Sequence, residues 1–193
     1  MSDHYHHGNL REALIDAGIK IINEQGEKGL SLRKAAASCG VSHAAPYAHF
    51  KNKEELVEAI KDSVNDQFMS ELNRAVSEAQ DTERALLNMG RSYVSFFVRN
   101  PDYFRFLFGN QGIVAHLMPG KTYKEDYPPF LLLKDTYRKY LKEKNIKKHK
   151  EEQELELIRL WAIAHGLAAI ACMSNVESSF DWEERKIWDV LLR

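Results

Sequence analysis

The chain has 193 residues, 44% of them hydrophobic and 28% charged, with a formal net charge of −1. This is the composition of an ordinary soluble globular protein, with room for one or two domains. Cys39 and Cys172 lie far apart and form no CxxC unit, which excludes a disulfide framework and suits a reducing cytoplasm. The N-terminus has no apolar signal core, and the longest apolar run, residues 161–173, is too short to span a bilayer.

Charge is unevenly distributed along the chain. Residues 1–53 contain seven lysines and arginines against five acidic residues, a net charge of +2, together with five of the eight histidines. The remaining residues contain 20 basic against 23 acidic residues, a net charge of −3. The overall charge therefore does not exclude the binding of a polyanion by a local basic face near the N-terminus.

The first fifty residues predict three short helices. Asn9 can cap the first helix with Glu12 as its reciprocal partner, and two glycines end it. Ser31 can cap the second helix, which Gly40 ends, and Ser42 can cap a third after a three-residue turn. Two short helices with a glycine turn between them are typical of a helix-turn-helix.

A fourth, longer helix is predicted to begin after Asn52 and to continue to about Gln80. Asn52 can cap it, with Glu55 as partner. Apolar residues recur at every fourth position along it: Leu56, Ile60, Val64, Phe68, Leu72 and Val76. The domain boundary is placed inside this helix, with one domain at residues 1–55 and a second at residues 56–193.

Five further helices are predicted in the second domain. They span residues 81–99 (beginning at Asp81 or Thr82), 103–108, 130–143, 152–175 and 182–192. Asn100-Pro101 breaks the chain between the first two, and residues 109–129 are expected to be mixed loop with one helical turn. Strand-like alternation is scarce throughout, so the predicted fold class is all-α.

The stretch GLSLRKAAASCGVSHAAPYAHFKNKEELVEAI resembles the DNA-binding domain of TetR-family transcriptional regulators. The matching residues are Gly40, Val41, Ser42, Tyr47, His49, Phe50, Lys53, Glu54 and Leu56. The opening YHHGNLREALIDA and the stretch LWAIAHGLAA, with its Trp-x3-His-Gly motif, are similar to one branch of that family. The resemblance implies an N-terminal three-helix helix-turn-helix DNA-binding domain, a C-terminal helical ligand-binding and dimerisation domain, no enzymatic activity and no cofactor.

The predicted third helix begins with small or polar residues, as a helix that enters the major groove of DNA requires. Alanine methyls can pack on thymine methyls, and His43 can hydrogen-bond a base edge or a phosphate. The resemblance implies that Tyr47 and Lys53 contact phosphates, beside the N-terminus of the fourth helix. The predicted DNA-contact residues are Ser31, Arg33, Ser42, His43, Ala44, Ala45, Tyr47, His49 and Lys53.

Pro46 departs from the commonest family pattern, which has leucine at this position. If Ser42 caps the third helix, Pro46 is the fourth helical residue, and at most one hydrogen bond, to the Ser42 carbonyl, is lost. Pro46 is therefore compatible with a short recognition helix.

Aromatic residues are dense between residues 93 and 108, and most of them must pack in the core. A subset could line a ligand cavity between helices. Trp161 and His165 are four residues apart and share one face of their own helix. A lone buried histidine is more often a hydrogen-bonded core residue than a ligand contact, and a pocket role for His165 is supported only by the motif resemblance. The predicted ligand-contact residues are Met89, Tyr93, Phe97, Phe104, Phe108, Trp161 and His165, and the expected effector is a small, mostly apolar molecule.

Three other interpretations compete with that of a regulator. His4, His6 and His7 could bind a metal, but no second cluster of ligands accompanies them, and a flexible arm is the preferred interpretation. An enzyme could use His165 or His116 with a carboxylate, but no phosphate loop, GxSxG or metal-spaced cluster is present. An interaction module with a vestigial helix-turn-helix is the third.

One recognition helix buries too little surface to find a genomic site alone. We therefore expect a homodimer that binds a pseudo-palindromic, double-stranded operator. The expected interface is the pair of C-terminal helices, residues 152–175 and 182–192. On the first of them the predicted contact stripe is Leu160, Ala164, Leu167, Ala168 and Ala171. The protein is expected to be a cytoplasmic repressor that leaves its operator when the effector binds, with no association with membranes.

Overall fold

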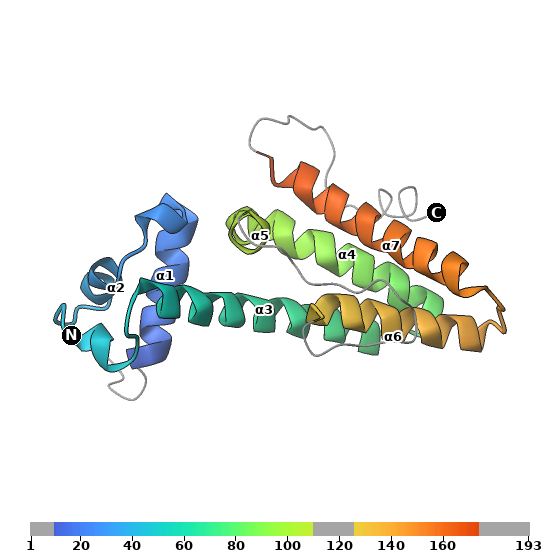
Figure 1. The fold of residues 1–193 in the computed structure, drawn as a ribbon, viewed down its shortest axis with the longest axis horizontal. Coiled ribbons are helices and arrows are strands. Elements are labelled where there is room, and N and C mark those ends of the chain that lie inside the picture. The colour runs from blue at the N-terminus through green and yellow to red at the C-terminus, as the bar shows by residue number, and fades with distance from the viewer. Residues whose placement is uncertain (1–9, 110–125, 174–193) are drawn as a thin grey trace. The chain divides into compact units, whose positions relative to one another are not determined.

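The structure, a computed structural model, describes residues 10–109 and 126–173. Every regular element in these two ranges is helical, which confirms the all-α prediction (Figure 1). The residue contacts divide the chain into two units, and the division falls inside helix α3, between Asp66 and Gln67. It therefore lies later in the chain than the boundary expected at residue 55, although both lie within the same helix.

Unit 1 is built from short helices around an aliphatic core. Its elements are α1 (Leu10–Gln25), the 3-10 helix η1 (Glu27–Gly29), α2 (Leu32–Ser38), the 3-10 helix η2 (Ala45–Ala48) and the first part of α3 (Lys53–Ser77). Helix α1 packs against α2 and both 3-10 helices. The least exposed large side chains in its core are Leu14, Ile22, Leu30, Phe50, Leu56, Ile60 and Val64. Each such burial stabilises the unit by about 1.5–3 kcal/mol.

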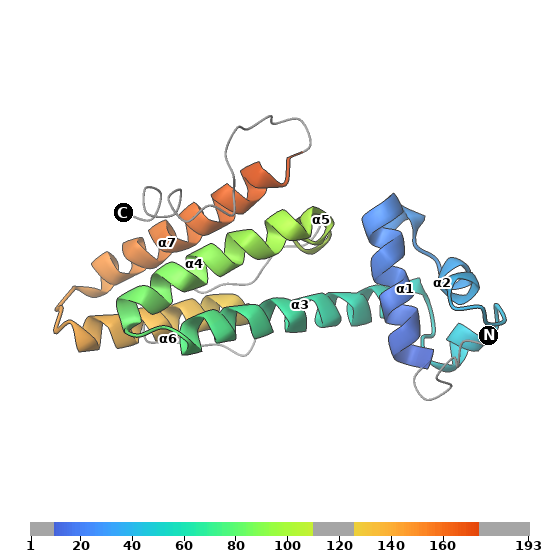
Figure 2. The same cartoon turned by 180° about the vertical axis from the view of Figure 1, so that it is seen from behind.

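Unit 2 contains the rest of α3 and four further helices. They are α4 (Thr82–Arg99), α5 (Pro101–Phe108), α6 (Pro128–Glu143) and α7 (Lys150–Ala171). Helix α4 packs against both α6 and α7, and the views from the front and from behind both place it beside α7 (Figures 1 and 2). Aromatic rings fill this core, with Phe68, Phe97 and Phe130 fully buried.

Four of the eight ends predicted for the helices after α3 are confirmed: both ends of α4 and the C-terminal ends of α5 and α6. Helices α5 and α6 each begin two residues before the prediction. The Asp81 carboxylate accepts the Arg84 N–H at 2.7 Å and caps α4. The break at Asn100-Pro101 separates α4 from α5, and Pro101 occupies the first turn of α5, where its missing N–H costs nothing. Helix α7 begins two residues before the prediction, because the Glu152 carboxylate accepts the N–H of His149 at 2.6 Å. It ends at Ala171, four residues before the predicted end.

Several predicted features lie outside the described residues. They are the Asn9 cap, His4, His6 and His7, His116, most of the loop predicted at residues 109–129, and the final helix at residues 182–192. Within the described ranges, every helix is either too short or too polar to cross a lipid bilayer.

Candidate DNA-binding surface and aromatic cluster

The turn after α2 is set by backbone hydrogen bonds around one glycine. Gly40 has a positive φ of 68°, a conformation that glycine adopts without steric cost. Its N–H bonds to the Ala37 carbonyl, and the Val41 N–H bonds to the Ala36 carbonyl, both at 3.1 Å. These two bonds form a Schellman motif, which ends α2 and turns the chain towards the next helix.

The recognition segment is shorter and tighter than predicted. We expected an α-helix capped by Ser42, but the structure has the 3-10 helix η2 at Ala45–Ala48, preceded by a turn. The Ser42 carbonyl accepts the N–H of Ala45, three residues on, at 3.0 Å. An α-helix would instead pair this carbonyl with position 46, four residues on. Pro46 is thus the second residue of η2 and not the fourth residue of an α-helix. Because a residue in the first turn of a helix needs no N–H, the proline removes no helical hydrogen bond.

The predicted DNA-contact residues lie at the surface of unit 1. Six of them are exposed: Arg33, Ser42, His43, Ala44, Tyr47 and His49. Ser31, Ala45 and Lys53 are partly exposed. The residues interspersed with them, Leu32, Ala35, Pro46 and Phe50, are buried. The Tyr47 side chain is 62% exposed, which is unusual for a large aromatic residue without a partner to bind.

Two of these residues also stabilise unit 1. The Ser31 hydroxyl accepts the Lys34 N–H at 3.2 Å, which confirms the predicted cap of α2. The Lys53 ammonium donates to the Glu27 carbonyl at 3.1 Å and so ties the start of α3 to η1. Both side chains keep further protons for an external acceptor, because a hydroxyl has one donor and an ammonium has three.

The N-terminus of α3 is partly occupied by its own side chains. The Asn52 amide oxygen accepts the Glu55 N–H at 2.9 Å, as predicted for the cap. The Glu55 carboxylate reaches back one residue further than predicted and accepts the Lys51 N–H at 2.6 Å. An anion that approaches this helix end would therefore meet the Lys53 ammonium and only the remaining free N–H groups of the first turn.

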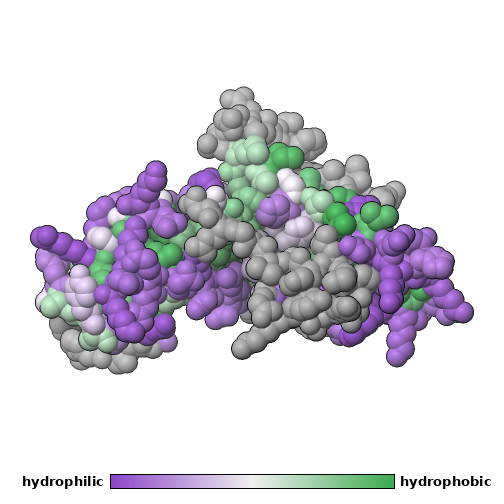
Figure 3. Space-filling view, viewed as in Figure 1, coloured by the Kyte–Doolittle hydropathy of each residue, from purple (hydrophilic) through white to green (hydrophobic). Residues whose placement is uncertain are grey.

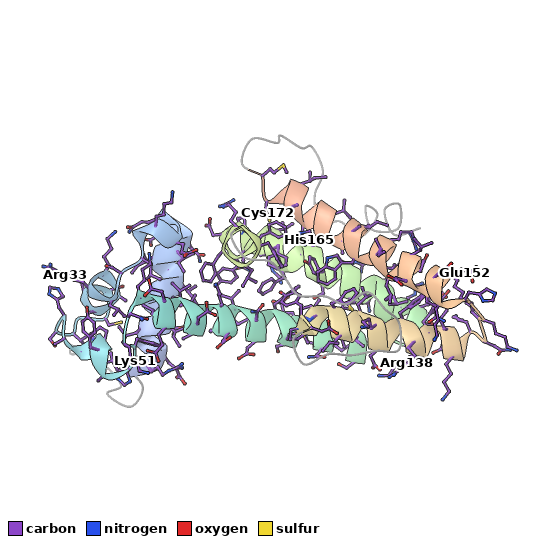
Figure 4. All side chains as sticks on the ribbon, viewed as in Figure 1. Arg33, Lys51, Arg138, Glu152, His165 and Cys172 are labelled. Atoms are coloured by element: carbon purple, nitrogen blue, oxygen red, sulfur yellow. The ribbon has the colours of Figure 1, made fainter. Side chains whose placement is uncertain are left out.

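Two basic residues that the sequence prediction omitted lie beside this surface. The Arg11 guanidinium on α1 lies over the Phe50 ring, 5.4 Å from its centroid, and Lys51 follows Phe50 directly. Both side chains are exposed. Figure 4 labels Lys51 and Arg33 at the surface of unit 1, and hydrophilic residues cover much of the visible face of that unit (Figure 3). The adjacency of Lys51 to Lys53 was a signal for Lys51, whereas nothing in the local sequence links Arg11 to Phe50.

A hydrogen-bonded polar pair lies among the aromatic rings of unit 2. The Tyr93 hydroxyl on α4 lies 2.9 Å from Nδ1 of His165 on α7. Tyr93 is buried and His165 is half-buried. Figure 4 shows His165 on the side of α7 that faces α4.

Four aromatic rings surround the His165 imidazole. Phe108 lies edge-on at 4.9 Å between ring centroids, Phe104 at 5.1 Å, and Trp161 is stacked nearly parallel at 6.1 Å. The Tyr93 ring completes the set at 6.3 Å. We call these five residues the aromatic cluster. Phe97 joins it through contacts with Tyr93, Phe104 and Phe108. Met89, also in the predicted set, is buried on α4 one turn before Tyr93.

Burial perturbs the ionisation of the polar pair. It lowers the pKa of the His165 imidazole, because an apolar environment disfavours the charged form. Burial also raises the pKa of the Tyr93 hydroxyl well above its usual value, with smaller contributions from Tyr127 and Cys172. Both groups are therefore held neutral near pH 7. A neutral histidine that accepts the tyrosine proton at Nδ1 carries its own proton on Nε2, where it can donate.

Two aromatic residues near the cluster were not in the predicted set. Tyr127 contacts Phe108 and Trp161, both at 6.1 Å between centroids, and Phe130 contacts Trp161 at 5.3 Å. Phe130 is the first residue of the helix predicted at residues 130–143, and its apolar character was a signal for including it. Tyr127 precedes two prolines and was interpreted as loop.

Each ring of the cluster lies within 6.3 Å of the His165 ring between centroids. A cavity of about 640 Å³ in unit 2 lies elsewhere, between the end of α3, the start of α4 and α6. One of its lining residues, Ala85, is eight residues before Tyr93 along α4, or about 12 Å at 1.5 Å per residue.

Residues 14–60 match the family model described as bacterial regulatory proteins, tetR family. This range contains α1, the glycine turn, the recognition segment and the capped start of α3. The match covers 47 of the 193 residues.

Other known proteins resemble larger parts of the chain. It is 30% identical over 103 residues to the nucleoid occlusion factor SlmA of Photobacterium profundum, a match that covers 53% of each chain. The chain thus spans about half the length of the curated relatives it matches. The structure superposes on a Rhodococcus sp. RHA1 protein of unknown function with a TM-score of 0.75, 24% identity and coverage of 98% and 97% of the two chains. It superposes on AibR, solved with isovaleryl coenzyme A and operator DNA, with a TM-score of 0.64, 16% identity and coverage of 94% and 95%. At such identities these two likenesses show the fold alone.

Helix α7 has some of the predicted small residues on its inner face. Ala164 is 8% exposed and Ala168 is fully buried, so the stripe predicted for dimer contact is wrong in these two residues. They pack inside unit 2 because α7 lies against α4. The outer face instead carries exposed apolar residues: Leu155 (66%), Ile158 (38%), Ile170 (44%) and Met173 (49%). Between them lie Ala162 and Gly166, and a Cβ added to Gly166 would meet open space.

The described residues offer no group of three or more histidine, cysteine, aspartate or glutamate side chains that could hold a metal ion. The two cysteines are both buried and free.

Proposed function

We propose that this protein is a cytoplasmic, homodimeric regulator that binds a pseudo-palindromic operator and releases it when a small, mostly apolar ligand enters unit 2. The observation that carries the proposal is the pairing of two features in one chain. One is a TetR-family DNA-binding domain whose polar recognition residues are exposed, and the other is a polar pair enclosed by aromatic rings.

Contact with DNA is proposed for two classes of residue. His43 and Ala44 lie before η2 and are exposed at the start of the recognition segment, where they can reach base edges. Tyr47, Lys53 and the neighbouring Lys51 are proposed to hold phosphates, because each offers a donor at the surface beside the start of α3. Rigid backbone around Pro46 supports a fixed presentation of these side chains.

A ligand role is proposed for the aromatic cluster. Apolar walls with one hydrogen-bonding group are typical of sites for small, mostly apolar molecules. The Nε2–H of His165 can supply that group, and the Trp-x3-His-Gly motif at Trp161, His165 and Gly166 supports it through the resemblance to one TetR branch. AibR, whose fold is similar, was solved with an acyl coenzyme A and operator DNA, which is consistent with an acyl ligand here.

A homodimer is proposed through the outer face of α7, with the chain beyond residue 173 as a second contributor. Exposed apolar residues along one helix face are expected to be covered by a partner. The small residues Ala162 and Gly166 at the centre of this face allow two helices to approach closely. Hydrophobic surface over α7 is visible in Figure 3. Two recognition segments would then read half-sites about 34–36 Å apart, or a multiple of one DNA turn.

Binding to the DNA that flanks its own gene tests the regulator proposal. Lys53→Ala should weaken binding to all sequences alike and reduce the salt slope by about one unit, because one phosphate contact is lost. Trp161→Ala should retain operator binding but no longer release the operator with the ligand found by mass spectrometry of the native protein. Altered base preference at unchanged affinity in Lys53→Ala, or normal ligand release in Trp161→Ala, would contradict the respective assignment.

Sedimentation or light scattering tests the dimer proposal. Ile158→Asp together with Ile170→Asp should yield monomers, because two buried unpaired carboxylates cannot be accommodated in an apolar interface. Lys148→Asp, an exposed change just before α7, is the control and should leave the dimer intact. An intact dimer in the double variant would place the interface elsewhere.

A further inference from the structure

The cavity at the far end of α4 from the aromatic cluster has no role in the function proposed above. It is about 640 Å³ in volume and is walled by the last turns of α3, the connection to α4, the first turn of α4 and one face of α6. We call it the α3–α4–α6 cleft. Sites for small ligands usually enclose about 300–1,000 Å³, so the cleft is large enough for a molecule of one or two rings. In Figure 2 the end of α3 and the start of α4 lie next to each other.

The floor of the cleft is apolar apart from the hydroxyls of two threonines, Thr136 and Thr82. Ala85 is buried, and Val76 and Leu132 are half-buried. Thr136 is 2% exposed, and its hydroxyl donates to the Leu132 carbonyl at 2.8 Å. The buried Thr82 hydroxyl has no hydrogen-bond partner in the described residues, so the floor offers a ligand an apolar surface with one free hydroxyl.

Three of the four charged side chains that line the cleft already have partners. The Glu143 carboxylate accepts the Thr82 N–H at 3.3 Å, and the Asp81 carboxylate caps α4 through the Arg84 N–H at 2.7 Å. The Lys139 ammonium pairs with Asp135 at 2.7 Å. Both carboxylates thus accept N–H groups at the N-terminus of α4. The Lys139 ammonium, one of the two cations, is paired with a carboxylate of its own helix, α6.

Arg74 is the exception among these charged groups. It lies in the last turn of α3 and is exposed, and its guanidinium has no hydrogen-bond or ion-pair partner in the described ranges. A free guanidinium at the edge of an apolar cleft is suited to a carboxylate or sulfonate, which it can bind through two parallel hydrogen bonds. A cationic ligand would need the Glu143 or Asp81 carboxylate, and these already accept the N–H groups of Thr82 and Arg84.

We infer that the α3–α4–α6 cleft binds a small amphipathic organic anion, with its acidic group on Arg74 and its apolar part on Val76, Ala85 and Leu132. This site is separate from the aromatic cluster, and the inference does not depend on a ligand role for His165. Its α3 wall is the end of a 25-residue helix whose first turn, at Lys53, bonds to unit 1. A ligand in the cleft therefore contacts an element that both units share.

Two fluorescent probes of similar shape test the inference on the full chain. The probes are the anionic dye 1-anilinonaphthalene-8-sulfonate and its uncharged relative N-phenyl-1-naphthylamine. Arg74→Gln should weaken binding of the anion at least three-fold, leave the uncharged probe unaffected and be rescued by Arg74→Lys. The matched control is Arg84→Gln, which removes an exposed arginine that does not line the cleft.

A second variant tests the cavity without changing charge. Ala79→Phe places a ring in the cleft from its half-buried position in the connection and should abolish binding of both probes at this site. Arg84→Gln should leave both affinities unchanged. Circular dichroism confirms that each variant is folded. The inference is overturned if Arg74→Gln and Ala79→Phe bind the anionic dye like the wild type, if Arg84→Gln weakens its binding as much as Arg74→Gln does, or if a cationic analogue binds more tightly than the anion.

Discussion

The cores of the two units are built from different kinds of side chain. Unit 1 buries aliphatic residues, and Phe50 is the aromatic ring among its fully buried large side chains in the described range. Unit 2 buries rings against rings: Phe68 alone lies within 5.0 Å of Tyr93, Phe96 and Phe97 between centroids. An aliphatic core leaves unit 1 with its polar groups outside, whereas the aromatic core of unit 2 encloses a hydrogen-bonded polar pair.

This difference matches the tasks proposed for the two units. A surface that reads DNA needs a rigid backbone and polar residues outside, and short caps with a small aliphatic core provide both. A site that admits an apolar ligand needs large apolar faces inside with a few polar groups among them. The contrast can be measured separately in each unit, because all three tryptophans follow residue 160 and belong to unit 2. Tryptophan fluorescence thus reports unit 2, while circular dichroism reports both.

The largest expected effect comes from removing the central ring of unit 2. Phe68→Ala should lower the free energy of unfolding by about 3–5 kcal/mol, because it deletes a fully buried ring with three aromatic neighbours. Urea denaturation followed by tryptophan fluorescence measures this loss. The counterpart Leu14→Ala should cost unit 1 about 2–5 kcal/mol and appear in circular dichroism. If Phe68→Ala left the fluorescence transition in place, the ring would not be central to unit 2.

Much of unit 1 could be predicted from the sequence because its signals are local. The caps at Ser31 and Asn52 act on N–H groups three residues away, and Gly40 acts on its own backbone. The recognition segment was the error. Ser42 was predicted to cap an α-helix. In the structure its carbonyl instead accepts the N–H of Ala45, which closes a tighter turn. Whether a four-residue helix is α or 3-10 depends on such single bonds, which sequence periodicity does not resolve.

A smaller effect is expected from removing one cap in each unit. Ser31→Ala should destabilise unit 1 and Asp81→Ala should destabilise unit 2, each by about 1 kcal/mol, because each loses one hydrogen bond to a helix N-terminus. The first change should appear in circular dichroism only, and the second should also shift the tryptophan transition. A fluorescence shift in Ser31→Ala would mean that the two units unfold as one and that the comparison between them fails.

The site in unit 2 could be predicted only in part because its contacts are distant in sequence. Tyr93 and His165 are 72 positions apart, and their hydrogen bond depends on how α7 is rotated against α4. The same rotation decides which face of α7 is outside. The small residues Ala164 and Ala168 suggested a dimer contact, but close packing between α4 and α7 uses them inside the unit. The 3.6-residue repeat of a helix shows which residues share a face, but it does not show which of two apolar faces packs against the core.

The smallest expected effect concerns the pH dependence of unit 2. Burial lowers the pKa of His165 below its unfolded value of about 6.5. Below that pH the unfolded chain therefore binds more protons at this residue than the folded chain does. The stabilisation is fully present above about pH 6.5 and is lost as the pH falls from there to the lower folded pKa. Protonation would also make Nδ1 a donor, so that the Tyr93 hydroxyl could no longer donate to it.

His165→Gln keeps a hydrogen-bonding group but cannot titrate, so its free energy of unfolding should fall less than that of the wild type between pH 7.5 and 5. Urea denaturation followed by tryptophan fluorescence at several pH values measures the difference, and carboxylates elsewhere contribute equally to both proteins. Parallel pH profiles for the two proteins would show that the imidazole is not desolvated by the rings around it.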